Sequence, residues 1–127
     1  MKYQFHHIHL LCRDLEQMIL FFTATLGANL VERKKFDTAD GATLNLHDTI
    51  INLRIDREDE TVLPDTSLTH YGYNHIGFTV EDIEKSYSEL TRKGYDFFGP
   101  PKEVGKNKVA FFSGPENITI ELLQPIE

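Results

Sequence analysis

The 127-residue chain is long enough for one domain, or for two small modules that share a core. Its formal charge of −7 disfavours attraction to a phosphate backbone, so nucleic acid is not an expected partner. A single cysteine, Cys12, excludes an intrachain disulfide. The N-terminus lacks an apolar signal core, and no apolar run approaches the length of about 18 residues that a membrane span needs. We therefore expect a cytoplasmic protein without a membrane partner.

An internal repeat organises the chain. The stretch "FHHIHLLCRDLE" at residues 5–16 is followed much later by the similar stretch "YNHIGFTVEDIE" at residues 73–84. Aligning His7 with His75 aligns the rest of the two stretches, whereas His6 faces the other side of the strand from His7. Each stretch begins with the alternation of a strand and continues with the apolar spacing of a helix.

The two predicted helices have matching ends. Asp14 and Asp82 stand where N-caps belong, and Gly27 and Gly94 stand where the helices should stop.

Short strand-like runs follow each helix, so each half is predicted to be a βαβββ unit and the fold class is α+β. We place the first module at about residues 1–56, an acidic surface linker at about 57–71, and the second module at about 72–127, all within one domain. The runs are "ANLVERKKF", "ATLNLHD" and "TIINLRI" in the first half and "YDFFG", "KVAFFSG" and "ITIELLQ" in the second.

Four polar residues occupy related positions in the two halves. His7 and His75 lie on the first strand of each module, and Asn52 and Glu121 lie opposite one another in the alignment of the last strands. Because side chains alternate along a strand, all four are predicted on the face away from their strand's aliphatic row. Each alone could be an ordinary solvated side chain, but together two histidines and a carboxylate match a ligand set used for divalent metals.

The pattern resembles the vicinal oxygen chelate superfamily, which includes glyoxalase I, methylmalonyl-CoA epimerase, extradiol dioxygenases, fosfomycin-resistance enzymes and bleomycin-resistance proteins. The segments that carry the resemblance are "HHIHLLCRDLEQMILFFTATLG", "NHIGFTVEDIE" and "VAFFSGPENITIELLQ". The resemblance implies an eight-stranded mixed sheet curled into a cup, with helices outside and a divalent metal (Ni, Co, Mn, Zn or Fe) inside. It implies His7, His75 and Glu121 as metal ligands, with Asn52 at the fourth position.

Three departures from the family pattern bear on function. Glyoxalase I and the epimerase usually have Glu or Gln where this chain has Asn52. Bacterial glutathione-dependent glyoxalases have an arginine where this chain has Leu11, and fosfomycin-resistance enzymes have a tyrosine where it has Phe111.

The favoured function is a metal-dependent isomerase or lyase of glyoxalase or epimerase type that moves an α-proton of a small oxygenated substrate. Glu121 and His9 are the candidate bases. Arg54 could neutralise a substrate carboxylate, although a solvated arginine is the simpler interpretation, and the "DREDE" run beside it is interpreted as a solvated loop. The alternatives are a non-haem Fe(II) or Mn(II) ring-cleaving dioxygenase and a non-catalytic binding or resistance protein.

We also expect a homodimer, since proteins of this type commonly pair. The sequence adds one indication, because Leu20 and Phe21 lie off the apolar stripe of the first helix.

Overall fold

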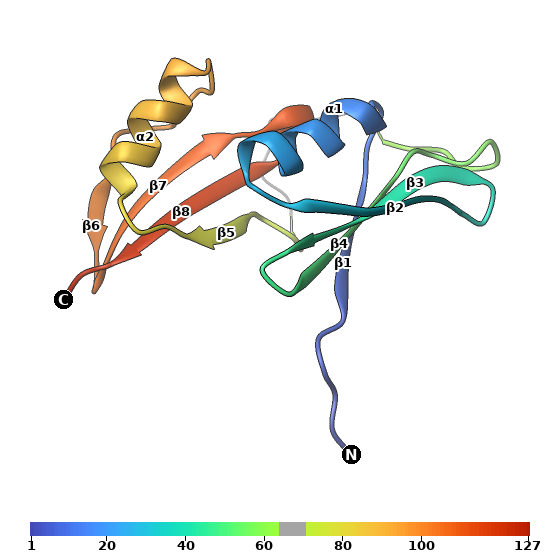
Figure 1. Cartoon of the computed structure of the whole chain (residues 1–127), viewed down its shortest axis with the longest axis horizontal. Coiled ribbons are helices and arrows are strands. Elements are labelled where there is room, and N and C mark those ends of the chain that lie inside the picture. The colour runs from blue at the N-terminus through green and yellow to red at the C-terminus, as the bar shows by residue number, and fades with distance from the viewer. Residues whose placement is uncertain (64–70) are drawn as a thin grey trace. The chain divides into compact units, whose positions relative to one another are not determined.

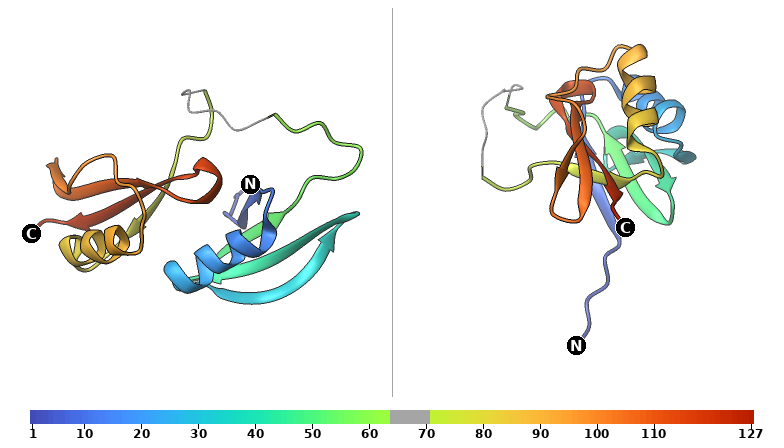
Figure 2. Two further views of the ribbon diagram at one scale, coloured as in Figure 1. Left: turned by 90° about the horizontal axis from the view of Figure 1, so that it is seen from above. Right: turned by 90° about the vertical axis from the view of Figure 1, so that its left-hand side faces the viewer.

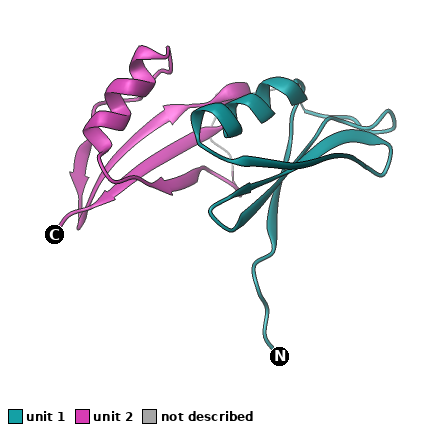
Figure 3. Ribbon diagram, viewed as in Figure 1, with its two compact units in different colours: residues 1–64 teal, residues 65–127 magenta. Residues whose placement is uncertain are grey.

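The computed structural model describes residues 1–63 and 71–127 (Figure 1). Part of the predicted linker, residues 64–70, lies outside the described residues. The chain divides into two compact units, Met1–Pro64 and Asp65–Glu127 (Figure 3).

The first unit is a four-stranded mixed sheet with one helical segment. Its strands lie in the order β1-β4-β3-β2, with β1 parallel to β4 and the other neighbours antiparallel. The elements are β1 (His7–Leu11), α1 (Leu15–Leu20), the π-helical turn η1 (Phe21–Thr25), β2 (Asn29–Phe36), β3 (Ala39–Leu46) and β4 (Thr49–Arg54).

The second unit repeats this topology. Its strands lie in the order β5-β8-β7-β6, and β5 is parallel to β8 as β1 is to β4. The elements are β5 (Ile76–Thr79), α2 (Ile83–Arg92), β6 (Lys102–Val104), β7 (Asn107–Ser113), the 3₁₀ turn η2 (Pro115–Asn117) and β8 (Thr119–Pro125).

These two units confirm the α+β class and the βαβββ order of each half. The strands lie in two sheets of four, where one sheet of eight was expected. Curvature of the sheets into a common cup stays a prediction.

Each helix packs on its own sheet and buries one apolar face there (Figure 2). In the first unit, α1 and η1 contribute Met18 and Phe22, both at most 1% exposed, to a core that also holds residues of β3 and β4. In the second unit, Ile83 and Leu90 of α2 do the same over β7 and β8. Among the described residues, no helix combines the length and the apolarity needed to cross a membrane.

The predicted helix ends are confirmed. The carboxylates of Asp14 and Asp82 accept hydrogen bonds from the backbone N–H groups of Gln17 and Lys85, at 3.0 and 3.1 Å. Gly27 and Gly94 follow the helices with φ of +83° and +100°, a conformation that glycine adopts without steric cost.

Of the two residues that suggested a dimer, Leu20 is exposed and Phe21 is buried. Phe21 is only 3% exposed and belongs to the core of its unit, whereas Leu20 is 63% exposed. The helix changes at this point from α to π hydrogen bonding, with the N–H of Leu26 bonded to the carbonyl of Phe21 at 3.2 Å. A π turn rotates the following residues relative to an α-helix, so the apolar stripe cannot be read from α-helical spacing alone.

Candidate metal centre

In the second unit, His75, the residue just before β5, meets Glu121 of the neighbouring parallel strand β8. Nε2 of His75 lies 2.9 Å from Oε1 of Glu121. The register sets Glu121 beside Gly77, where a Cβ atom would come within 3.6 Å of Oε1. The carboxylate therefore runs along the sheet past a residue without a side chain, and this brings it to the histidine.

The imidazole of His75 is oriented by the residue before it. Nδ1 of His75 lies 2.7 Å from Oδ1 of Asn74. An amide oxygen only accepts hydrogen bonds, so Nδ1 is the donor in this contact. Nε2 faces a carboxylate oxygen, and at this distance a proton or a cation lies between the two atoms.

A divalent metal fits this pair of atoms. Imidazole and carboxylate are suitable ligands for the divalent ions in question, and a hydrogen bond on the second ring nitrogen is the usual support of a metal-binding histidine.

The first unit repeats the arrangement around His7. Nδ1 of His7 lies 2.8 Å from Nδ1 of His6, so here too the Nδ1 atom of the histidine contacts the preceding residue. His6 aligns with Asn74 in the repeat, and the pairing of each with its following histidine was not anticipated. The alignment of the two stretches contained this signal, because the neighbours of both histidines can form hydrogen bonds.

Asn52 is buried, with 8% of its surface exposed, and its amide is already engaged. The hydroxyl of Thr43, directly across the β3–β4 pair, donates a hydrogen bond of 2.7 Å to Oδ1 of Asn52. Oδ1 is the atom with which asparagine would bind a metal. Thr43 was not anticipated as part of the site, although it lies on the predicted strand run directly before that of Asn52.

His9 lies beside Asn52 in the β1–β4 register and packs against Phe36, with ring centroids 4.6 Å apart. Partial burial lowers the pKa of His9 below its usual value of 6.5, and the positive charge of Arg54 and the neighbouring His7 add to this effect. An imidazole with a lowered pKa is mostly uncharged near pH 7, which is the protonation state a base requires.

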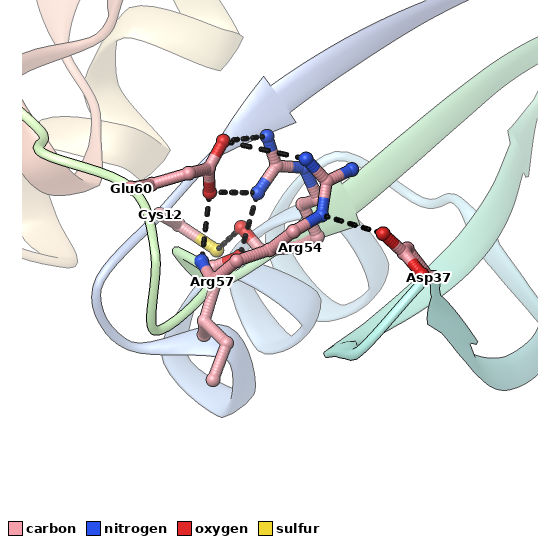
Figure 4. A network of polar contacts seen from close by, with 6 residues as sticks. Cys12, Asp37, Arg54, Arg57 and Glu60 are labelled. Carbon is pink, nitrogen blue, oxygen red and sulfur yellow. Dashed lines mark hydrogen bonds and ion pairs between the residues drawn. The ribbon is translucent and has the colours of Figure 1, made fainter.

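Arg54 is bound within the protein. Its two terminal nitrogens contact the two carboxylate oxygens of Glu60 at 2.6 and 2.8 Å, and the backbone N–H of Arg57 donates to Glu60 at 2.7 Å (Figure 4). The guanidinium holds the pKa of Glu60 at about 2. Glu60 belongs to the run interpreted as a solvated loop, yet it is half-buried and anchors residues 55–60 to the end of β4.

The structure thus brings together His75 with Glu121 in one unit, and His7, His9 and Asn52 on neighbouring strands of the other. Within residues 1–63 and 71–127, no three His, Cys, Asp or Glu side chains form a group that could hold a metal ion. The predicted ligands come from both units, so their meeting at one ion stays a prediction.

A family model provides the classification. The model of the glyoxalase/bleomycin resistance protein/dioxygenase superfamily matches residues 4–122. The chain belongs to this superfamily.

Curated relatives of the chain include glyoxalases. A lactoylglutathione lyase of Schizosaccharomyces pombe is 23% identical over 98% of this chain and 48% of its own length. A protein of Arabidopsis thaliana named glyoxylase I 4 is 29% identical over 92% of this chain and 68% of its own length. The chain therefore spans about half the length of the yeast lyase.

Solved structures share the fold. A glyoxalase family protein from Bacillus cereus has a TM-score of 0.84 at 21% identity, covering 100% of this chain and 97% of that one. The fosfomycin resistance protein FosX from Listeria monocytogenes, solved with Mn(II) and sulfate, has a TM-score of 0.73 at 16% identity, covering 98% and 93%. A protein with this fold has thus been solved with a divalent metal bound.

Proposed function

We propose that the protein is a metal-dependent isomerase or lyase of glyoxalase or epimerase type, with His7, His75 and Glu121 as metal ligands. The observation that carries this proposal is the contact between Nε2 of His75 and Oε1 of Glu121 at 2.9 Å, supported by Asn74 on the far side of the ring. The names of the curated relatives point to the same class of chemistry.

In such an enzyme, the metal supplies Lewis acidity that makes the α-proton of a bound carbonyl compound more acidic. The protein's own groups then move that proton. His9 is the proposed base, because its pKa is lowered and its side chain lies on the strand that carries His7. Glu121 is the second candidate, and in that role its carboxylate would exchange contact with His75 for contact with the substrate.

Substrates of the proposed enzyme are small molecules with adjacent oxygen atoms, such as the thiol adduct of a 2-oxoaldehyde or an acyl thioester. A homodimer and a cytoplasmic location are part of the proposal.

A ring-cleaving dioxygenase that uses Fe(II) or Mn(II) is the second candidate. The hydrogen bond from Thr43 to Oδ1 of Asn52 favours it, because His7, His75 and Glu121 then remain as the three strong ligands. Two histidines and one carboxylate with open positions form the ligand set of such non-haem iron enzymes.

The test is metal analysis of untagged protein purified without chelators, beside His75→Ala and a control, His47→Asn. His47 is exposed in the β3–β4 turn with φ of +47°, a conformation that asparagine tolerates. We expect about one divalent ion per chain in the wild type and the control, and loss of the ion in His75→Ala.

The identity of the bound ion and two activity assays then distinguish the candidate functions. Turnover of the methylglyoxal–thiol adduct with a metal that needs no redox change supports the isomerase or lyase. Oxygen uptake with a catechol and ferrous iron supports the dioxygenase. A wild-type protein that holds no metal, and takes up none of Ni²⁺, Mn²⁺, Zn²⁺ or anaerobic Fe²⁺, contradicts both and favours the binding protein.

A further inference from the structure

Asn52 is the one buried polar side chain among the described residues, and its two amide atoms have different environments. Its oxygen accepts the hydroxyl of Thr43 at 2.7 Å. This contact fixes the plane of the amide and points its NH₂ group away from Thr43.

The nitrogen of this amide is free to bind something else. Within residues 1–63 and 71–127, no hydrogen bond to Nδ2 of Asn52 occurs, and this atom is not among the fully enclosed polar atoms that lack a partner. This nitrogen therefore contributes to the 8% of Asn52 that is exposed. In the β1–β4 register Asn52 stands beside His9, so its side chain lies on the same face of the sheet as His9, the proposed base.

The equivalent residue of the second unit, Glu121, has a different cross-strand neighbour. Glu121 faces Phe111 across the β7–β8 pair, as Asn52 faces Thr43 across β3–β4. Phenylalanine offers no hydrogen-bond donor, so the carboxylate of Glu121 is left to contact His75. Threonine does offer a donor, and it occupies the oxygen of Asn52.

We propose that Asn52 binds the substrate through its NH₂ group and does not ligate the metal. The nitrogen of a neutral amide is a donor and has no lone pair to offer a metal. It is suited to an oxygen atom that gains negative charge when the α-proton leaves, and a fixed donor aimed at such an oxygen stabilises the transition state. This inference rests on the proposed function, because it assumes a substrate whose oxygens are chelated at the site.

The residue thereby sets what the site accepts. A substrate must place an acceptor oxygen next to the NH₂ group, and an analogue without that oxygen leaves a donor unpaired at a buried position. Thr43 is a positioning residue, which acts by holding the amide in one orientation.

The experiment measures two binding constants for each variant: that of Mn²⁺, and that of acetohydroxamate for the Mn²⁺-loaded protein, both by titration calorimetry. Acetohydroxamate is the probe because it presents two adjacent oxygens, one of them negatively charged. The variants are Asn52→Ala, Thr43→Val and Thr43→Ser, with His75→Ala as the ligand reference and Asn29→Ala, at an exposed position of β2, as the control.

We expect Asn52→Ala to bind Mn²⁺ within about threefold of wild type and acetohydroxamate about tenfold more weakly, the effect of losing one hydrogen bond to a charged group. Thr43→Val frees the amide to rotate, so it should weaken acetohydroxamate binding by a smaller factor and leave Mn²⁺ binding unchanged. Thr43→Ser restores the hydroxyl and should behave like the wild type. These two variants keep the test decisive if Asn52→Ala does not fold.

Four results would overturn the inference. If Asn52→Ala loses Mn²⁺ as His75→Ala does, Asn52 is a ligand, and the proposed function stands without this refinement. If Asn52→Ala and Thr43→Val bind acetohydroxamate as tightly as the wild type, or the loaded wild type does not bind it at all, the NH₂ group contacts no chelated oxygen. A wild-type protein that binds no Mn²⁺ ends the proposed function and this inference together, and no variant is needed to recognise that case.

Discussion

His75 and Glu121 are separated by a large part of the second unit in sequence, yet their side chains meet at 2.9 Å because β5 and β8 are parallel neighbours. Asn74 binds the other ring nitrogen, Nδ1, so both nitrogens of His75 have a partner. An imidazole nitrogen and a carboxylate oxygen this close are held by a proton or by a cation, and imidazole and carboxylate are both ligands of divalent metals, which is why we propose this pair as part of a metal site.

The first prediction concerns Asn74. Asn74→Ala removes the acceptor of the hydrogen bond from Nδ1 of His75. The ring then loses the contact that orients it and that favours a hydrogen on Nδ1. Outer partners of this kind typically contribute about 10–100-fold to metal affinity. We expect Mn²⁺ affinity, measured by titration calorimetry, to fall by that factor.

Two further variants make this prediction specific. Asn74→Asp keeps an acceptor oxygen and should retain most of the affinity. Asn107→Ala, in β7 and away from the histidine, is the control and should bind Mn²⁺ like the wild type. Equal affinities for Asn74→Ala and the wild type would show that the ring needs no support from Asn74.

The fold was largely predictable because its signals are local and occur twice. The repeated stretch around His7 and His75 gave two equivalent modules, and the caps at Asp14 and Asp82 and the glycines beyond the helices gave correct helix ends. The single eight-stranded sheet was not confirmed: the described strands form one sheet of four in each unit, and alternation along a strand does not reveal which other strands it pairs with.

The candidate site was predictable only in part, since alternation along a strand gives the face of a side chain and not its partner. It put His75 and Glu121 on one face, and the structure adds that they touch. Alternation could not show that Asn52 is held by Thr43, or that Arg54 is paired with Glu60. The rotamers of polar side chains depend on neighbours from other segments of the chain. The joint binding of one metal by both units remains a prediction.

The second prediction concerns Gly41 in β3. A Cβ atom there would collide with the backbone carbonyl of Leu53 and come within 2.5 Å of the ring of Phe36, which in turn packs on His9. Gly41→Ala should therefore lower the free energy of unfolding by about 1–3 kcal/mol, the usual cost of overpacking a core.

Urea unfolding measures this cost, with Gly99→Ala as the matched control. A Cβ at Gly99 meets nothing within 4 Å, and its φ is not in the left-handed region. The control should unfold at the same urea concentration as the wild type or slightly above it. If Gly41→Ala were as stable as the control, the packing of Phe36 against β3 would be looser than the structure has it.

The third prediction concerns the N-cap of α2. The carboxylate of Asp82 accepts the N–H of Lys85 at 3.1 Å, and its negative charge lies at the positive end of the helix dipole. Asp82→Ala should destabilise the protein by about 1 kcal/mol, and Asp82→Asn, which can still cap, by much less. Thermal unfolding of the two variants side by side checks this. Equal melting temperatures for Asp82→Ala and Asp82→Asn would show that the cap contributes nothing.

The fourth prediction concerns pH and the ion pair of Arg54 with Glu60. The folded protein holds the pKa of Glu60 at about 2, below its usual value of 4.5, because Arg54 and the backbone N–H of Arg57 bind the charged carboxylate. A group with a lowered pKa stabilises the fold above its ordinary pKa and loses that contribution as the pH falls through the folded value. The stabilisation by Glu60 should therefore be complete above about pH 5 and decline toward pH 2.

Glu60→Gln removes the titrating group, so the comparison isolates its effect. We expect the variant to be less stable than the wild type at pH 7, and the difference between the two to shrink steadily between about pH 5 and pH 2 in urea unfolding experiments. Glu58→Gln, at an exposed position of the same segment, is the control and should follow the wild-type profile much more closely. A difference between Glu60→Gln and the wild type that stays constant down to pH 2 would mean that the carboxylate contributes through its shape and hydrogen bonds alone, because only a contribution from its charge disappears when the group is protonated.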